Sequence, residues 1–127
     1  MNIENAIKQG YLKFKKNNIK SALLDSQLLM SKTIKKDKKF IILNSTKELK
    51  HSDYEFFKKL ISYRAKSKPI AYLTGIKSFW NDDFFLNDKV LIPRPDSELL
   101  VEQVLKIYKN KSKINFLEIG IGSGCLI

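Results

Sequence analysis

The chain has 127 residues, of which 43% are apolar and 11% aromatic, so it can bury a core and is not a disordered tail. Its single cysteine, Cys125, excludes an internal disulfide, and with His51 as the single histidine no His/Cys metal cluster is expected, so we predict no bound metal. No segment approaches the roughly 18 consecutive apolar residues of a membrane span, and the start of the chain lacks the layout of a signal peptide, which predicts a cytoplasmic protein.

The formal net charge of +11 is unevenly distributed along the chain. Residues 1–69 hold 17 basic and 6 acidic residues, whereas residues 70–127 hold 7 of each. A basic surface of this kind attracts an acidic protein or a nucleic acid. The alternative is a general enrichment in lysine, because 22 of the 24 basic residues are Lys and nucleic-acid readers favour the guanidinium of Arg.

Four helices are predicted in the first half of the chain. Apolar residues recur at helical spacing over 3–14 and again over 19–34, with an Asn pair between the two segments. A short third helix is predicted after Asp37. The fourth begins at an S-x-x-E pattern, Ser52 and Glu55, which is typical of a capping box, and must end before Pro69.

After Pro69 the sequence changes to short β-prone runs over residues 71–80, 83–88 and 89–93, which predict a small hairpin. Pro93 and Pro95 end the extended segment, and Asp96 or Ser97 is predicted to cap a helix that runs to about Tyr108. A polar linker then leads to the run over 114–119, which is apolar and β-branched and predicts a buried strand of the parallel type.

That predicted strand leads into a glycine-rich turn. A Walker loop and a dinucleotide fingerprint are both excluded, because Cys125 occupies the position where each pattern needs a glycine or alanine. The remaining pattern is acid-x-G-x-G-x-G, formed by Glu118, Gly120, Gly122 and Gly124, and it resembles the first motif of S-adenosylmethionine-dependent methyltransferases. Glycines let the backbone approach a ligand with φ > 0, and the carboxylate can face an ammonium group. The alternative is a tight strand-to-helix connection without a ligand.

Two further stretches, "KPIAYLTGIKSFW" (68–80) and "VLIPRPDSELLVEQVL" (90–105), closely resemble the HemK/PrmC family. The resemblance covers residues 64–127 strongly and the helical part weakly. It implies an enzyme that transfers a methyl group from S-adenosylmethionine to the side-chain amide of a glutamine in peptide chain release factors. The implied fold class is an α+β fragment: an N-terminal helical bundle (residues 1–74) that recognises the protein substrate, then a β-hairpin linker and the incomplete start of a Rossmann-like methyltransferase domain (residues 75–127).

The resemblance also implies which residues form the site. The expected cofactor-binding residues are Glu118, Gly120, Ile121, Gly122, Ser123 and Gly124. Arg94, Asp96 and Glu98 are candidates for lining the active site, and Phe79 and Trp80 could line a pocket or form a buried aromatic pair. Glu118 and Ile121 are mild departures from the commoner family pattern, D-L-G-T-G-[ST]-G.

The family orients the glutamine amide with an N-P-P-Y motif, and this motif is absent from the chain, whose only prolines are Pro69, Pro93 and Pro95. We therefore expect no catalytic residue among these 127 residues and interpret the chain as a truncated product holding the N-terminal part of the enzyme. Two alternatives stay open: a fragment of an adenine-N6 nucleic-acid methyltransferase, and a non-catalytic basic helical module that binds RNA or the ribosome.

Overall fold

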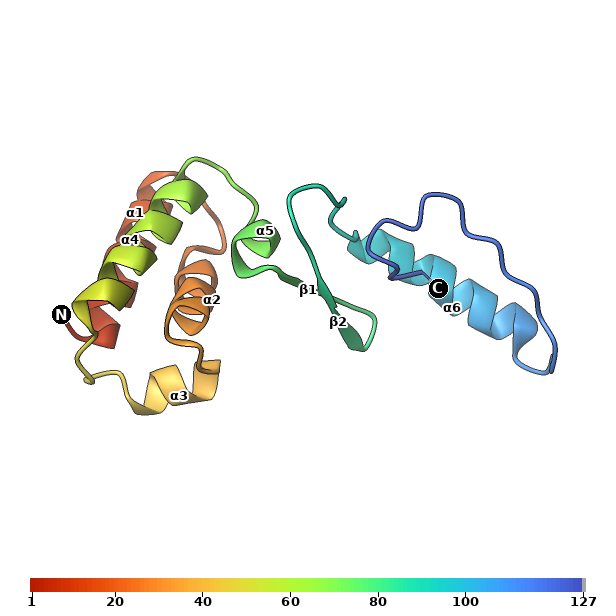
Figure 1. Cartoon of the computed structure of the whole chain (residues 1–127), viewed down its shortest axis with the longest axis horizontal. Coiled ribbons are helices and arrows are strands. Elements are labelled where there is room, and N and C mark those ends of the chain that lie inside the picture. The colour runs from red at the N-terminus through yellow and green to blue at the C-terminus, as the bar shows by residue number, and fades with distance from the viewer. Residues whose placement is uncertain (127) are drawn as a thin grey trace. The chain divides into compact units, whose positions relative to one another are not determined.

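The computed structural model describes residues 1–126, and Ile127 lies outside the described residues (Figure 1). The described residues divide into two compact units, Met1–Thr74 and a second that begins at Gly75. Between residues 1 and 126, no helix has the length and apolar character needed to cross a membrane. In chain order the elements are α1 (Ile3–Lys16), α2 (Ala22–Ile34), α3 (Lys38–Leu43), α4 (His51–Ala65), α5 (Ile70–Thr74), β1 (Ile76–Phe79), β2 (Asp82–Phe85), the 3-10 turn η1 (Pro95–Ser97) and α6 (Glu98–Tyr108).

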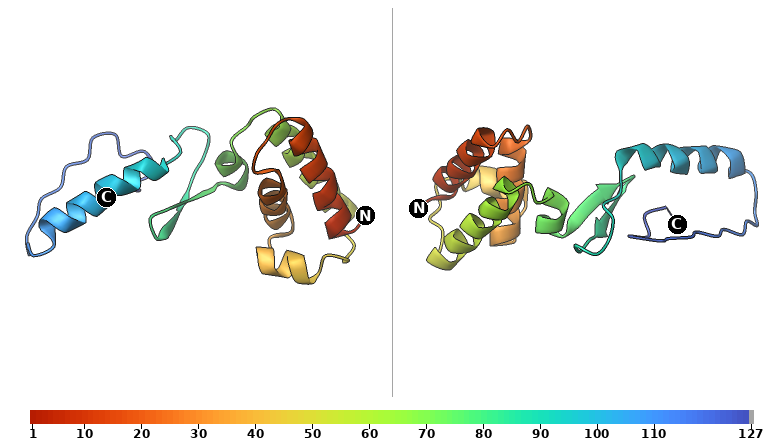
Figure 2. Two further views of the ribbon diagram at one scale, coloured as in Figure 1. Left: turned by 180° about the vertical axis from the view of Figure 1, so that it is seen from behind. Right: turned by 90° about the horizontal axis from the view of Figure 1, so that it is seen from above.

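The first unit, which we call the helical unit, is built on α1, α2 and α4, which pack against one another (Figures 1 and 2). The side chains of Phe14, Leu29, Met30 and Phe57 are completely buried between them. Full burial of one such side chain stabilises a fold by about 1.5–3 kcal/mol. The helical unit therefore has a core of its own.

The sequence predicts α1 and α3 correctly, and polar caps fix where both begin. The Asn2 side chain accepts a hydrogen bond from the amide of Asn5 (2.9 Å), and Asp37 accepts one from the amide of Phe40 (2.7 Å). Each cap satisfies an amide that has no partner within its helix. The second helix begins at Ala22, three residues later than the pattern predicts from Ile19.

The predicted capping box at Ser52 and Glu55 is wrong. Helix α4 begins at His51, and its N-terminal cap is Lys50, whose side chain makes no capping hydrogen bond. Glu55 instead forms an ion pair with Lys58 (3.0 Å), and this hydrogen bond raises the pKa of Lys58. The S-x-x-E pattern thus lies inside the helix, where the carboxylate of Glu55 pairs with Lys58 one turn further along.

The helices of the helical unit meet closely at Gly10. A Cβ at this position would overlap with the hydroxyl of Ser26 and lie 2.8 Å from Cδ1 of Ile61. Ser26 is fully buried and donates its hydroxyl to the carbonyl of Ile7 (2.8 Å). A side chain at Gly10 would displace this bond, so the glycine is needed for space between α1, α2 and α4.

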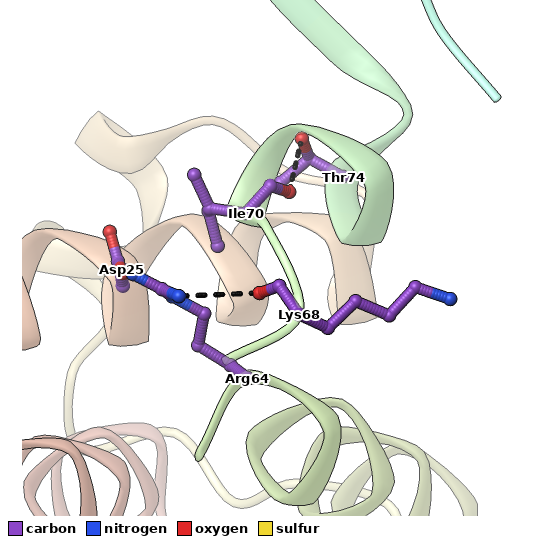
Figure 3. A network of polar contacts seen from close by, with 5 residues as sticks. All are labelled: Asp25, Arg64, Lys68, Ile70 and Thr74. Atoms are coloured by element: carbon purple, nitrogen blue, oxygen red, sulfur yellow. Dashed lines mark hydrogen bonds and ion pairs between the residues drawn. The ribbon is translucent and has the colours of Figure 1, made fainter. Parts of the chain in front are cut away.

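A buried ion pair joins α2 to α4 and to the turn that follows (Figure 3). The Nε of Arg64 donates to Oδ2 of Asp25 (2.7 Å), and the two side chains are 17% and 3% exposed. The same guanidinium donates to the carbonyl of Lys68 (3.3 Å), just before α5. Removing one partner of such a pair costs about 3–5 kcal/mol, since the other charge stays buried.

The predicted β-run over residues 71–80 is only half correct. Residues Ile70–Thr74 form helix α5, which buries Ala71 and Leu73 and whose last side chain, Thr74, donates to the carbonyl of Ile70 (3.1 Å). The strand begins only after Gly75, whose φ of 77° turns the chain. β-prone residues form a helix here, where tertiary contacts that bury Ala71 and Leu73 outweigh propensity.

The predicted hairpin is confirmed as β1 and β2, which pair antiparallel with Ile76 opposite Phe85 and Phe79 opposite Asp82. Residues 89–93, which the sequence predicts as a third β-run, form no strand. The fold is an α+β arrangement with one two-stranded sheet among the described residues.

After α6, which ends at Tyr108 as predicted, the chain runs back beside the helix as irregular backbone (Figures 1 and 2). The predicted buried strand over 114–119 is wrong for this structure, because these residues pair with no strand and Leu117 and Ile119 are 87% and 90% exposed. A parallel strand needs neighbours to accept its hydrogen bonds, and residues 1–126 supply none. The start of a Rossmann-like sheet is therefore not confirmed.

We expect Gly10→Ala to destabilise the helical unit. Alanine normally favours a helix by about 1 kcal/mol over glycine, but overpacking at this contact costs about 1–3 kcal/mol. Urea unfolding followed by circular dichroism measures the change. Lys8→Ala, an exposed site on the same helix, is the control and should stay within about 0.5 kcal/mol of the parent. An equal or higher stability for Gly10→Ala would contradict the packing described.

We expect amide exchange to be slow in the helical unit and fast in residues 114–119. None of the residues of α6 is buried, so little apolar contact protects the segment beside it. Hydrogen exchange of the 127-residue chain, read by mass spectrometry, tests this. Equal protection of Phe116–Glu118 and Phe57–Ile61 would show that the second unit has a core that the structure lacks.

Candidate functional site

The glycine turn has the backbone conformation that the sequence predicts. Gly120, Gly122 and Gly124 have φ values of +81°, +59° and +76°. Other residues rarely adopt this region, because the left-handed conformation costs them about 1–2 kcal/mol each. The amide of Gly124 donates to the carbonyl of Ile121 (2.9 Å), which closes the turn.

The glycines are required by their φ angles and not by crowding. A Cβ built on Gly120 would meet no atom within 4 Å, and one on Gly122 would lie 3.8 Å from the carbonyl oxygen of Gly120. Space over the turn is therefore open. A ligand can reach this backbone without displacing side chains of residues 1–126.

A pocket of about 180 Å³ lies against this turn. One wall is the glycine segment, including Ile121 and Ser123, and the other is the rigid stretch from Leu91 to Arg94. The structure thus brings Pro93 and Arg94 close to the glycine turn. Arg94 and Gly120 are 26 residues apart in the sequence. Arg94 is exposed at this pocket, whereas Asp96, in the 3-10 turn, is exposed but does not line it.

Glu118 carries an acceptor without a partner. Its Oε2 is buried and forms no hydrogen bond with any described residue, although the residue as a whole is half-buried. A buried carboxylate oxygen without a donor costs free energy, and a charge-assisted bond from a ligand would remove that cost. Glu118 also lines the pocket, so its carboxylate group is a candidate partner for a cationic group bound there.

Glu98, Phe79 and Trp80 form a separate arrangement. The carboxylate of Glu98, at the start of α6, accepts a hydrogen bond from the backbone amide of Trp80 (2.8 Å). Phe79 is 1% exposed and contacts Phe84 edge to face, with ring centroids 6.3 Å apart. The hydrogen bond ties the hairpin to α6, whereas the aromatic contact lies within the hairpin. The lining of the pocket described above does not include Glu98, Phe79 or Trp80.

The sequence does not single out two features of this unit. Ile92 and Ser97 also line the pocket beside the glycine turn, and the signal that could have indicated them is the family-like stretch 90–105 that contains both. A larger apolar groove of about 420 Å³ lies between α6 and the segment 116–118, with Leu100 and Val104 on the helix side. Their spacing of four residues, which predicts the helix, is the signal for this groove.

Known proteins resemble the chain over nearly its whole length. It is 38% identical over 126 residues to the release factor glutamine methyltransferase of Clostridium botulinum, a match that covers 99% of the chain and 44% of that protein. It is also 38% identical to the release factor glutamine methyltransferase of Buchnera aphidicola, in a match that covers 99% of the chain and 45% of that protein. The bifunctional methyltransferase of Rickettsia conorii is 32% identical over 138 residues, covering 90% of the chain and 26% of that protein. The chain spans less than half the length of these relatives.

The model of one protein family matches residues 5–75, which is more than half of the chain. Its description is "PrmC N-terminal domain". The matched segment corresponds closely to the compact unit Met1–Thr74, with its core of α1, α2 and α4. The match therefore rests on a complete structural unit, and the chain belongs to the PrmC N-terminal domain family.

Proposed function

We propose that the chain is the N-terminal part of a methyltransferase that uses S-adenosylmethionine to methylate a glutamine side-chain amide in peptide chain release factors. The names of the relatives support the substrate. The observation that carries the proposal is local to this chain: three glycines with left-handed φ angles lie beside the unpaired carboxylate oxygen of Glu118. A cytoplasmic location follows from this substrate and stays part of the proposal.

The residues of the turn fit the methyl donor. S-adenosylmethionine, when bound, supplies a methyl group on a positively charged sulfur. In the proposal, Oε2 of Glu118 accepts hydrogen bonds from the ammonium of the methionyl group, and the open backbone at Gly120 and Gly122 lies against the ligand. Ile121, Ser123 and Gly124 complete the turn, and Arg94 forms part of the opposite wall.

We also propose roles for two further residues of the second unit and for the helical unit as a whole. Glu98 acts as a positioning residue, since it holds the amide of Trp80 and so fixes the hairpin to α6. Asp96, exposed, stays a candidate for the active-site lining. The helical unit, with most of the lysines, is proposed to bind the release factor. The groups that orient the amide are proposed to come from a part of the enzyme outside these 127 residues.

A basic module that binds RNA is the second candidate function, and only the charge favours it. The one arginine among residues 1–69, Arg64, is held in the ion pair with Asp25 and donates to Lys68. The exposed cations of this unit are therefore lysines. Lysine contributes point charge but lacks the planar fork that reads a base edge. The protein-binding role is therefore preferred.

We expect the 127-residue chain to transfer no methyl group, because it lacks the motif that orients the amide. The assay uses radiolabelled S-adenosylmethionine and a bacterial release factor. The matched experiment joins residues 1–127 to the remaining part of the Clostridium botulinum relative, and this chimera should be active. Transfer by the chain alone would contradict the first expectation, and a folded but inactive chimera would contradict the proposed function.

In that chimera, we expect Gly122→Val to abolish binding of S-adenosylmethionine. A β-branched residue at a φ of +59° is strained by about 1–2 kcal/mol or more, and its side chain would occupy the space left to the ligand. Titration calorimetry measures donor affinity. Lys59→Ala on α4 is the control and should leave donor affinity unchanged, because it lies in the other compact unit. If Gly122→Val binds the donor normally, the turn is only a connection and the site assignment fails.

A further inference from the structure

The helical unit contains a pocket that the proposed reaction does not use. It has a volume of about 220 Å³ and lies where α3 and the segment 47–50 meet the start of α1. Its apolar lining includes the half-buried side chains of Ile34, Phe40 and Leu49. Its charged lining includes the exposed side chains of Lys36, Lys47 and Lys50. The pocket is thus apolar inside and basic at its edge.

Backbone hydrogen bonds hold the walls of this pocket. The amide of Leu49 donates to the carbonyl of Met1 (2.9 Å), and the amide of Ile3 donates to the carbonyl of Lys47 (3.1 Å). On the other side, the cap at Asp37 fixes the start of α3. A preformed pocket loses little conformational entropy when it is filled, which favours binding.

The lysines at the edge lack acidic partners. No carboxylate of residues 1–126 forms an ion pair with Lys36, Lys47 or Lys50. Of the two acids at the pocket, Glu48 is paired with the N-terminal ammonium (2.6 Å), which leaves Asp53 alone against three cations. The pocket therefore carries an excess of positive charge.

The ammonium groups of Lys36 and Lys47 lie over the ring of Phe40, 5.5 and 5.6 Å from its centroid. Binding of a nucleic acid at this pocket would use the ring as a stacking platform, and the two lysines cover it. A peptide does not need to stack on the ring of Phe40. One of its apolar side chains can enter between Ile34 and Leu49, while flanking carboxylates meet ammonium groups that already lie at the edge.

We propose that this pocket is a docking site for an acidic segment of a partner protein, in which an apolar side chain is flanked by Asp or Glu. The charge complementarity and the apolar lining together identify this occupant. The docking site does not depend on the methyltransferase assignment, because every residue that forms it lies in the helical unit.

The experiment uses the 127-residue chain and a fluorescent ten-residue peptide in which Glu and Asp flank Leu and Phe. Fluorescence anisotropy measures affinity, and amide shifts in NMR spectra locate the contact. We expect the largest shifts in residues 34–40 and 47–50. The double variant Lys36→Glu/Lys47→Glu should weaken binding roughly tenfold or more, since it replaces attraction by repulsion.

The matched control is Lys20→Glu/Lys59→Glu, which makes the same change of net charge at two exposed lysines outside the pocket. We expect its affinity to stay within about twofold of the parent, and circular dichroism to show both double variants folded. A peptide in which Ser replaces Leu and Phe should bind at least about tenfold more weakly. Equal losses in the two double variants, or equal binding of the Ser peptide, would overturn the proposal. So would tighter binding of a single-stranded RNA whose shifts fall on the same residues.

Discussion

The pairing of Asp25 with Arg64 is the constraint on which the organisation of the helical unit depends. The Asp25 carboxylate is buried on α2, and its charge is compensated by a guanidinium that comes from the end of α4. Because the same guanidinium holds the carbonyl of Lys68, it also fixes where the chain leaves α4 for α5 (Figure 3). Helix α5 has only five residues, too few to be stable alone, so its position depends on contacts of this kind.

This pairing also limits how the basic surface can act. With Arg64 committed, the positive charge of the helical unit is presented by lysines, whose strongly hydrated ammonium groups attract acidic partners with little geometric selectivity. Selectivity must then come from the shape and apolar lining of a pocket. The pocket beside Phe40 combines both properties.

The parts of the fold that the sequence predicts well are those with a local physical cause. The apolar spacing of α1 and the Asp37 cap of α3 act within a few residues, and both helices begin where the pattern predicts. Residues 70–74 are different. Two tertiary or local contacts override their β propensity. Ala71 and Leu73 are buried when these residues form a helix, and the carbonyl of Pro69 accepts hydrogen bonds from the amides of Tyr72 and Leu73 at 3.2 and 3.4 Å. Neither cause is visible in composition.

The candidate site also combines features that the sequence predicts with features that depend on tertiary structure. Positive φ angles at Gly120, Gly122 and Gly124 follow from residue type, and the sequence predicts them. The strand expected over 114–119 depends instead on neighbouring strands, which residues 1–126 do not provide. The unpaired oxygen of Glu118 and the closeness of Arg94 to the glycine turn are tertiary properties, which spacing along the chain cannot give.

The hydrogen bond between Glu98 and the hairpin places little restriction on which residue occupies position 80. Glu98 binds the backbone amide of Trp80, which any residue except proline would offer. The φ of Trp80 is +56°, a conformation in which glycine or asparagine is less strained than a bulky aromatic residue. Neither the turn nor its bond to Glu98 therefore selects tryptophan. The exposed indole of Trp80 sits on a backbone conformation that costs about 1–2 kcal/mol, a strain that glycine at this position would avoid.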